Sequence, residues 1–318
     1  MTETTTSAKS VSAVVLSGGA SLGAAQVGML RALIEAGIAI DLLVGTSVGA
    51  FNAAWLAGHP GQGIDSLVDI WASLRRRDVF PMNLWHSAWA LGGRRPSLAS
   101  DTGMRSLLAR HLTFARLEEA AIPLHVVAVD VQSGKDVLFS SGPAIDAVVA
   151  SASIPGLLPP VAIGERWYMD GAVVNNTPIS YAADLGAHSV WVLPAGYPCS
   201  LRRPPRSALA MAMQGLSTLV QHRLASDAER WHHGVDLRVV PPLCPIAVSP
   251  IDFSQSRSLI DQAYRSTAAW LARDCPDVSA ALYPHEHPNL PAWGASSSSG
   301  PEASSVAAHG ARHNGDRP

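Results

Sequence analysis

The segment Asp41-Leu-Leu-Val-Gly-Thr-Ser-Val-Gly-Ala50 joins a short apolar run to a helix-forming sequence. The apolar run predicts a buried strand, and the residues from Ala50 onward predict a helix. Between them, Gly45-Thr46-Ser47-Val48-Gly49 has the G-x-S-x-G pattern of a nucleophile elbow. Gly45 and Gly49 fit this turn because larger side chains would collide there. Ser47 is therefore a candidate nucleophile, placed at a helix N-terminus whose partial positive charge favours a developing anion.

The whole chain has the composition of one large α/β domain. Its 318 residues are 47% hydrophobic, which is enough to bury a large core, and apolar runs alternate with helical patterns. A formal net charge of -2 gives no electrostatic case for a nucleic-acid partner. We expect one domain from 11 to 275, a flexible segment 1–10, and a C-terminal extension 276–318 that is disordered from about residue 294.

The compartment follows from the cysteines and the N-terminus. Cys199, Cys244 and Cys275 are far apart and lack metal-ligand spacing, so we interpret them as reduced thiols of a cytoplasmic protein. Residues 1–10 are polar, which predicts no secretory signal. No uninterrupted apolar stretch has the length of a membrane span. Peripheral contact with a membrane stays open, and the sequence leaves the oligomeric state unknown.

A second glycine-rich turn precedes the elbow. Residues 11–16 predict a strand, Ser17-Gly-Gly-Ala-Ser-Leu-Gly23 follows it, and a helix continues from about Ala24. This arrangement binds anions, because free backbone N–H groups point at the ligand. A dinucleotide-binding turn would need a glycine where Ala20 stands, together with an acid at the end of the next strand. A structural loop is a second alternative, but an oxyanion hole serving Ser47 fits best.

A third motif lies far downstream, in Arg166-Trp-Tyr-Met-Asp-Gly-Ala172. A strand ends at Asp170, small residues follow, and Thr177-Pro178 predicts the capped start of a helix. If Asp170 meets Ser47, it can take the hydroxyl proton as a general base. Taken alone, Asp170-Gly171 is better explained as a turn in which the carboxylate binds backbone amides, as in most Asp-Gly pairs.

Together, these three motifs resemble the patatin-like phospholipase family in order and separation, from about Val11 to Leu271. The resemblance implies a three-layer α/β sandwich, with a mostly parallel central sheet and helices on both faces. It implies a serine lipid acyl hydrolase, an esterase of phospholipase A type, that acts through an acyl-serine without metal or organic cofactor. It also implies a role for each motif residue: nucleophile Ser47, base Asp170, oxyanion donors Gly18, Gly19 and Ala20, and motif glycines Gly23, Gly45, Gly49 and Gly171.

Two positions depart from the family pattern. Ala20 stands where many members have a third glycine, and Leu22 stands where many have arginine. Ala20 keeps its N–H, but a left-handed backbone there costs about 1–2 kcal/mol. The loss of the arginine bears on recognition of an anionic headgroup more than on acyl chemistry.

Two rival functions stay open at this point. In a Ser-His-Asp hydrolase the base would be His188, His222, His232 or His233, although none of these has a local pattern like that of Asp170. The other rival is a non-catalytic lipid-binding protein on the same fold.

The remaining chemistry-bearing residues have weaker patterns. His125 lies near the start of a strand and is interpreted as structural, whereas Asp130 ends the same strand, where active-site groups gather. Residues 151–160 form an apolar loop suited to an acyl pocket. The segment 79–98, with Trp85 and Trp89, predicts either a flap over the site or ordinary packing.

Overall fold

The computed structural model describes residues 10–61, 63–81, 97–196, 208–231, 233–243, 248–273 and 275, all of them in one compact unit that spans residues 1–285. The sequence expectations for residues 1–9, 82–96 and 276–318, and for Cys199, Cys244 and His232, fall outside these ranges. Cys275 is a free thiol.

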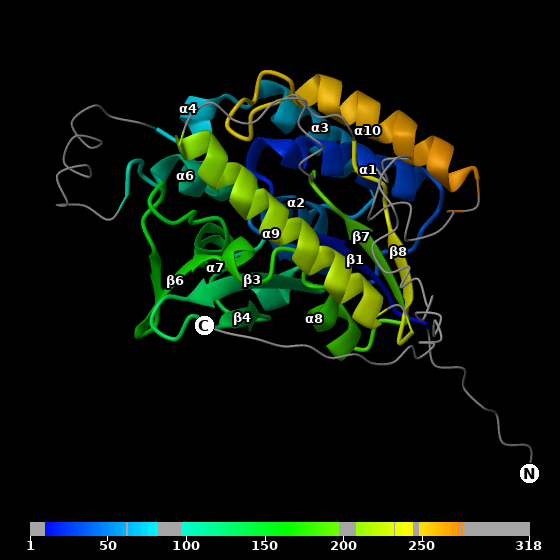
Figure 1. Ribbon diagram of the computed structural model, residues 1–318, viewed down its shortest axis with the longest axis horizontal. Coiled ribbons are helices and arrows are strands. Elements are labelled where there is room, and N and C mark those ends of the chain that lie inside the picture. Colours follow the sequence, from blue (N-terminus) through cyan, green and yellow to red (C-terminus); the bar gives the residue numbers. More distant parts are fainter. Residues whose placement is uncertain are drawn as a thin grey trace, which may run out of the picture. The chain divides into compact units, whose positions relative to one another are not determined.

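Strands and helices alternate along the described chain (Figure 1). The strands are β1 Ser12–Leu16, β2 Leu42–Thr46, β3 Leu124–Asp130, β4 Asp136–Phe139, β5 Val161–Ile163, β6 Arg166–Asp170, β7 Ser189–Leu193 and β8 Asp236–Val239. The α-helices are α1 Gly23–Glu35, α2 Val48–Gly58, α3 Gly63–Ser73, α4 Arg76–Val79, α6 Thr102–His111, α7 Ala144–Ser151, α8 Ile179–Asp184, α9 Ala208–Trp231 and α10 Ser256–Leu271. Three single 3₁₀ turns are η1 Ala20–Leu22, η2 Leu117–Glu119 and η3 Gly171–Val173.

One eight-stranded sheet runs through the described unit in the order β5-β6-β3-β2-β1-β7-β8, with β4 also paired to β3. The pairings among β1, β2, β3, β7 and β8 are parallel, whereas β4, β5 and β6 join through antiparallel pairs. The central strands are buried on both faces, as their continuous apolar runs predict. The predicted mostly parallel α/β fold is therefore confirmed.

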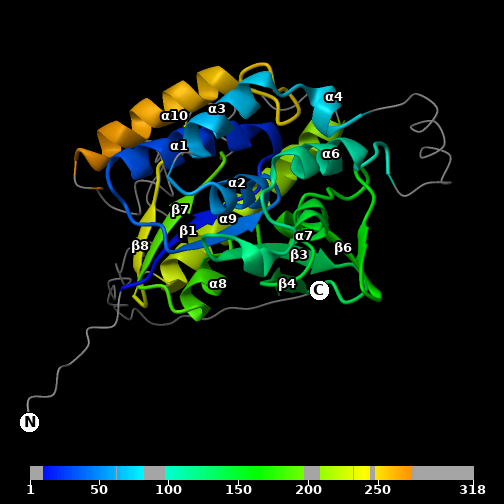
Figure 2. The same ribbon diagram turned by 180° about the vertical axis from the view of Figure 1, so that it is seen from behind.

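Helices cover both faces of the sheet and create two apolar layers. Figure 1 looks onto the face crossed by α8 and α9, and Figure 2 looks onto the face that carries α1, α2, α3, α6, α7 and α10. Alternate strand residues supply the two layers, since Val14 and Leu16 join one cluster while Ala13 and Val15 join the other. The site described below lies on the many-helix side.

The helix starts show one local error in the sequence expectations. Helix α8 begins at Ile179, with Pro178 as its N-cap and no side-chain cap hydrogen bond. The hydroxyl of Thr177 is buried and, within the described chain, has no hydrogen-bond partner. Thr177 is therefore buried before α8 and does not cap the helix.

A helix that crosses a bilayer must be long and continuously apolar. Within the ranges described above, no helix combines the length and the apolar run that a bilayer span requires.

Candidate active site

Ser47 and Asp170 meet because their strands end head to head on one edge of β3. Thr46, the last residue of β2, lies opposite Val127, and Asp170, the last residue of β6, lies opposite the next residue, Ala128. The other edge of β3 is occupied by β4. Ser47 follows β2 directly, and its Oγ donates a 2.7 Å hydrogen bond to Oδ2 of Asp170. Sheet register thus joins two residues that are 123 positions apart.

The backbone of Ser47 is strained. Its φ of 56° and ψ of -126° place it outside the usual regions for a residue with a side chain, between β2 and the first turn of α2. A Cβ on Gly45 would lie 2.6 Å from Cα of Ala50, and one on Gly49 would collide with the carbonyl of Leu16. The two glycines thus permit the tight strand–helix turn.

Ser151 supports this strained turn through two hydrogen bonds. The amide of Ser47 donates a 2.8 Å hydrogen bond to Oγ of Ser151. The Ser151 hydroxyl in turn donates a 2.5 Å hydrogen bond to the carbonyl of Val127. Ser151 ends α7 and is fully buried. Sequence reasoning missed this residue, because a serine at a helix end has no pattern that distinguishes it from a turn residue. The amide of Ser47 is thereby occupied, so it is not free to bind substrate.

Asp170 is almost completely removed from water, with 3% of its surface exposed. Burial raises its pKa to about 7, although hydrogen bonds from the Ala172 amide and the Ser47 hydroxyl favour the ionised form and oppose that shift. A Cβ on Gly171 would lie 2.9 Å from Cγ2 of Thr46, so only glycine lets the two strand ends approach so closely. Burial therefore makes this carboxyl group hold its proton more tightly than an exposed aspartate does.

The glycine-rich turn lies beside Ser47. The amide of Gly18 donates to the carbonyl of Asn176 at 3.3 Å. The amides of Gly19 and Ala20 have no hydrogen-bond acceptor within the described part of the chain. Ala20 has a left-handed φ of 50°, so the strain that a glycine would avoid is present. Gly23 lets α1 approach α2, because a Cβ there would lie 2.5 Å from Val48.

A buried amide network keeps this turn in place. Gln26 donates to the carbonyls of Ser17 and Leu193 at 2.8 and 2.9 Å, and Asn52 donates to Oε1 of Gln26. The indole N–H of Trp71 then donates to Oδ1 of Asn52 at 2.9 Å. The network joins α1, α2 and α3 to the strand ends. It rigidifies the elements that carry both turns, since partners left unpaired in the core would cost about 1–3 kcal/mol each.

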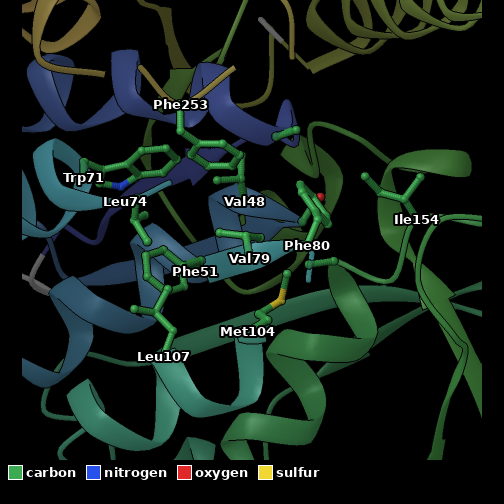
Figure 3. A pocket seen from close by; sticks show the side chains of 13 residues that line it. Val48, Phe51, Trp71, Leu74, Val79, Phe80, Met104, Leu107, Ile154 and Phe253 are labelled. Atoms are coloured by element: carbon green, nitrogen blue, oxygen red, sulfur yellow. The ribbon is translucent and has the colours of Figure 1, made fainter. Parts of the chain in front are cut away.

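An apolar pocket opens beside Ser47 (Figure 3). Two residues of the apolar loop after α7, Ala152 and Ile154, form part of its wall, in agreement with the role expected for that loop. The remaining lining residues come from the glycine-rich turn, α2, α3, α4, α6 and the segment before α10: Ala20, Ser47, Val48, Phe51, Trp71, Leu74, Val79, Phe80, Met104, Leu107 and Phe253.

The candidate histidines lie elsewhere. His188 comes just before β7 and His233 shortly before β8, at the amino edge of the parallel strands, whereas Ser47 follows the carboxyl end of β2. His222 is exposed on α9. Among the described residues, the Ser47 hydroxyl bonds to Asp170 and to no histidine.

His125 and Asp130 make contacts that are typical of structural residues. Nδ1 of His125 is 2.7 Å from the hydroxyl of Ser140. Asp130 forms an ion pair with Arg166 and accepts hydrogen bonds from the backbone amides of Gln132 and Ser133. Within the described ranges no cluster of three or more histidine, cysteine or acidic side chains is placed to hold a metal ion.

A family model and curated relatives point to the same protein family. The family model described as patatin-like phospholipase matches residues 14–183. Patatin-like phospholipase domain-containing protein 7 of Rattus norvegicus is 32% identical over 186 residues, which are 58% of this chain and 13% of that protein. Lysophospholipase NTE1 of Pyricularia oryzae is 30% identical over 185 residues, 58% of this chain and 12% of that protein.

Both curated relatives are thus several times longer than the matched region. Among solved structures, the human GIVD cytosolic phospholipase A2 aligns over 87% of this chain and 61% of its own, with a TM-score of 0.48 and 11% identity.

Proposed function

The chain belongs to the patatin-like phospholipase family, and on that premise we propose that it is a serine lipid acyl hydrolase with Ser47 as nucleophile and Asp170 as general base. The observation that carries this proposal is the 2.7 Å hydrogen bond between the Ser47 hydroxyl and the buried Asp170 carboxylate beside an apolar pocket. An aspartate is ordinarily a weak base toward a serine hydroxyl. Burial strengthens Asp170 as a base, since it raises the pKa of this carboxyl to about 7.

The reaction follows from these positions. The acyl chain of an ester lies in the apolar pocket, and Ser47 attacks its carbonyl while Asp170 takes the hydroxyl proton. The free amides of Gly19 and Ala20 bind the oxyanion; the amide of Gly18 already donates to Asn176. Asp170 then protonates the leaving alcohol. Water, deprotonated by the same carboxylate, releases the fatty acid from the acyl-serine.

The substrate class is the second part of the proposal. The pocket wall is almost entirely apolar, which suits a fatty acyl chain. A groove lined by Arg75, Arg76 and Ile251 shares Leu74 and Phe253 with the pocket wall. Ile251 is 43% exposed there. We therefore expect the enzyme to contact lipid surfaces peripherally at this groove, on the cytoplasmic side that reduced cysteines predict.

The test uses a short-chain p-nitrophenyl ester and a mixed phospholipid micelle. Ser47→Ala and Asp170→Asn should each lower hydrolysis of both substrates by about 10³-fold or more, whereas His188→Ala, His222→Ala, His232→Ala and His233→Ala should retain it. Each variant is first checked for folding by circular dichroism. If a histidine variant loses hydrolysis while Asp170→Asn retains it, the result would support the Ser-His-Asp alternative. Lipid binding by an inert wild type would support the non-catalytic alternative.

Peripheral contact has its own test. Ile251→Asp should lower hydrolysis of the micellar phospholipid several-fold and leave the soluble ester unchanged, because only the aggregated substrate presents a lipid surface. If Ile251→Asp hydrolyses the micellar phospholipid as fast as wild type does, the groove is not the place of lipid contact.

A further inference from the structure

Asn176 places a polar side chain beside Ser47 that the dyad mechanism leaves unused. It is 7% exposed, and within the described chain its carboxamide makes no hydrogen bond. Its Oδ1 lies 2.6 Å from the point where a Cβ of Gly18 would stand, and Cβ of Ser47 lies 3.0 Å from the same point. Because Gly18 has no side chain, the carboxamide and Cβ of Ser47 both border the space that a side chain would fill. The backbone carbonyl of Asn176 accepts a hydrogen bond from the amide of Gly18, which fixes the position of this residue.

The carboxamide also lies on a definite side of the nucleophile. Asn176 is absent from the wall of the apolar pocket, whereas Ala20, Val48 and Ile154 belong to it. The third atom near the vacant Cβ position of Gly18 is Cβ of Ala172, whose amide is bound to Asp170. Ser47 therefore has an apolar side and a polar side, and the polar side contains Asp170, Ala172 and Asn176.

The chemistry needs a binding position on that polar side. During acylation the leaving oxygen must receive its proton from Asp170, and during deacylation the attacking water must give a proton to Asp170. The alcohol and the water therefore occupy the same place, next to the carboxylate and away from the acyl chain. A single hydrogen bond to Asp170 does not orient a water molecule, so a second polar partner is required there.

We propose that the carboxamide of Asn176 is this partner, a catalytic group whose Nδ2–H donates to the leaving oxygen during acylation and whose Oδ1 accepts a hydrogen bond from the attacking water during deacylation. The inference rests on the proposed function. In deacylation the water oxygen, held by Asn176, forms the new bond to the acyl carbon and gives its proton to Asp170. The bond from that carbon to Oγ of Ser47 then breaks, and the proton passes from Asp170 to Oγ.

Esters with different leaving groups separate this role from a structural one. p-Nitrophenolate leaves without a proton, so acylation by its ester needs little from Asn176, whereas deacylation still needs the oriented water. In stopped-flow assays Asn176→Ala should release a burst of about one p-nitrophenol per enzyme, followed by turnover at least about tenfold slower than in wild type. Mass spectrometry of the quenched reaction should find the acyl group on Ser47.

The matched control is Thr177→Val. It is the neighbouring buried residue, and its hydroxyl has no partner among the described residues, so this variant should behave as wild type in both phases. A fluorophosphonate that reacts with Ser47 without a water step should label Asn176→Ala at close to the wild-type rate. An alkyl ester, whose alcohol must be protonated, should be acylated more slowly by Asn176→Ala.

Asn176→Asp is a second variant of the same size. A second carboxylate beside Asp170 disfavours its ionised form, so the acid limb of turnover should move to higher pH, a shift that loss of packing alone would not produce. Unchanged turnover in a folded Asn176→Ala would overturn the proposal. Parallel loss of burst, labelling and turnover would also overturn it, in favour of a structural role. Failure of the underlying function differs from both, because wild type itself would then form no acyl-enzyme.

Discussion

The hydroxyl of Ser47 donates a 2.7 Å hydrogen bond to Oδ2 of Asp170, and both side chains are at least 95% buried. Their meeting depends on β6, which runs antiparallel to β3 and ends where β2 ends. A buried carboxylate with a single hydroxyl and a single amide as hydrogen-bond donors has less solvation than it would have in water. The protonation of Asp170 therefore links activity and stability to pH.

Activity should depend on the ionised form of Asp170. Because burial raises its pKa to about 7, kcat/KM for a p-nitrophenyl ester should fall about tenfold for each pH unit below 7 and level off above it. The measurement is kcat/KM from pH 5 to 9, in wild type and in His188→Ala. A rate that stays flat down to pH 5 would show that a base of ordinary aspartate pKa, or none, controls the reaction.

Stability should show the opposite dependence on pH. Between about pH 4 and 7 the unfolded chain loses the Asp170 proton while the folded protein keeps it, so the free energy of unfolding falls as the pH rises. Asp170→Asn stays neutral and escapes this loss. Its stability advantage in urea titrations should grow by roughly 2–3 kcal/mol between pH 5 and 8. Exposed Asp69→Asn on α3 is the control, expected to change by less than about 0.5 kcal/mol at both pH values.

Ser151→Ala tests the support beneath the nucleophile. The change leaves the Ser47 amide and the Val127 carbonyl without their hydroxyl partner, so we expect a loss of about 2 kcal/mol in unfolding free energy and a lower kcat. Ser153→Ala is the matched control, since this equally buried hydroxyl bonds to Val149 and not to the elbow. It should retain kcat. Equal activity of wild type and Ser151→Ala would mean that the glycines alone keep Ser47 in position.

Ala20→Gly tests the strain in the glycine-rich turn. With φ at 50°, Ala20 costs about 1–2 kcal/mol relative to a right-handed position, and glycine removes that cost while adding up to about 1 kcal/mol of chain entropy. We expect a net gain of up to about 1 kcal/mol in unfolding free energy. Ala36→Gly, at a right-handed helix end, should instead be destabilising by a similar amount. A loss for both variants would indicate that Ala20 is stabilised by its contacts.

Leu107→Phe tests the acyl pocket. Leu107 lines the pocket, so a larger side chain fills the space that the distal methylenes of a long chain need, each contributing about 0.8 kcal/mol. The ratio of kcat/KM for a long-chain over a short-chain p-nitrophenyl ester should fall by tenfold or more. Leu108→Phe on the same helix points into the core, so it should lower stability by about 1–3 kcal/mol without changing that ratio.

Local sequence patterns were enough to predict the elements around the site. The elbow at Ser47, the glycine-rich turn and the strand that ends at Asp170 are all encoded by apolar spacing and by glycines that relieve close contacts. These are short-range effects, so they can be read within about ten residues. The same reasoning erred at Thr177, because the helix starts one residue later, with Pro178 as its N-cap, and the Thr177 hydroxyl is buried without a partner among the described residues.

The sequence by itself therefore determined the fold class, the family resemblance and the two residues proposed as the dyad. Only the tertiary structure decided that β6 pairs antiparallel with β3, which joins Asp170 to Ser47, and that Ser151 and Asn176 lie beside the nucleophile. The pocket wall likewise gathers side chains from four α-helices and several loops. Pairing and packing between distant segments depend on register and on complementary shape, and neither leaves a local pattern in the chain.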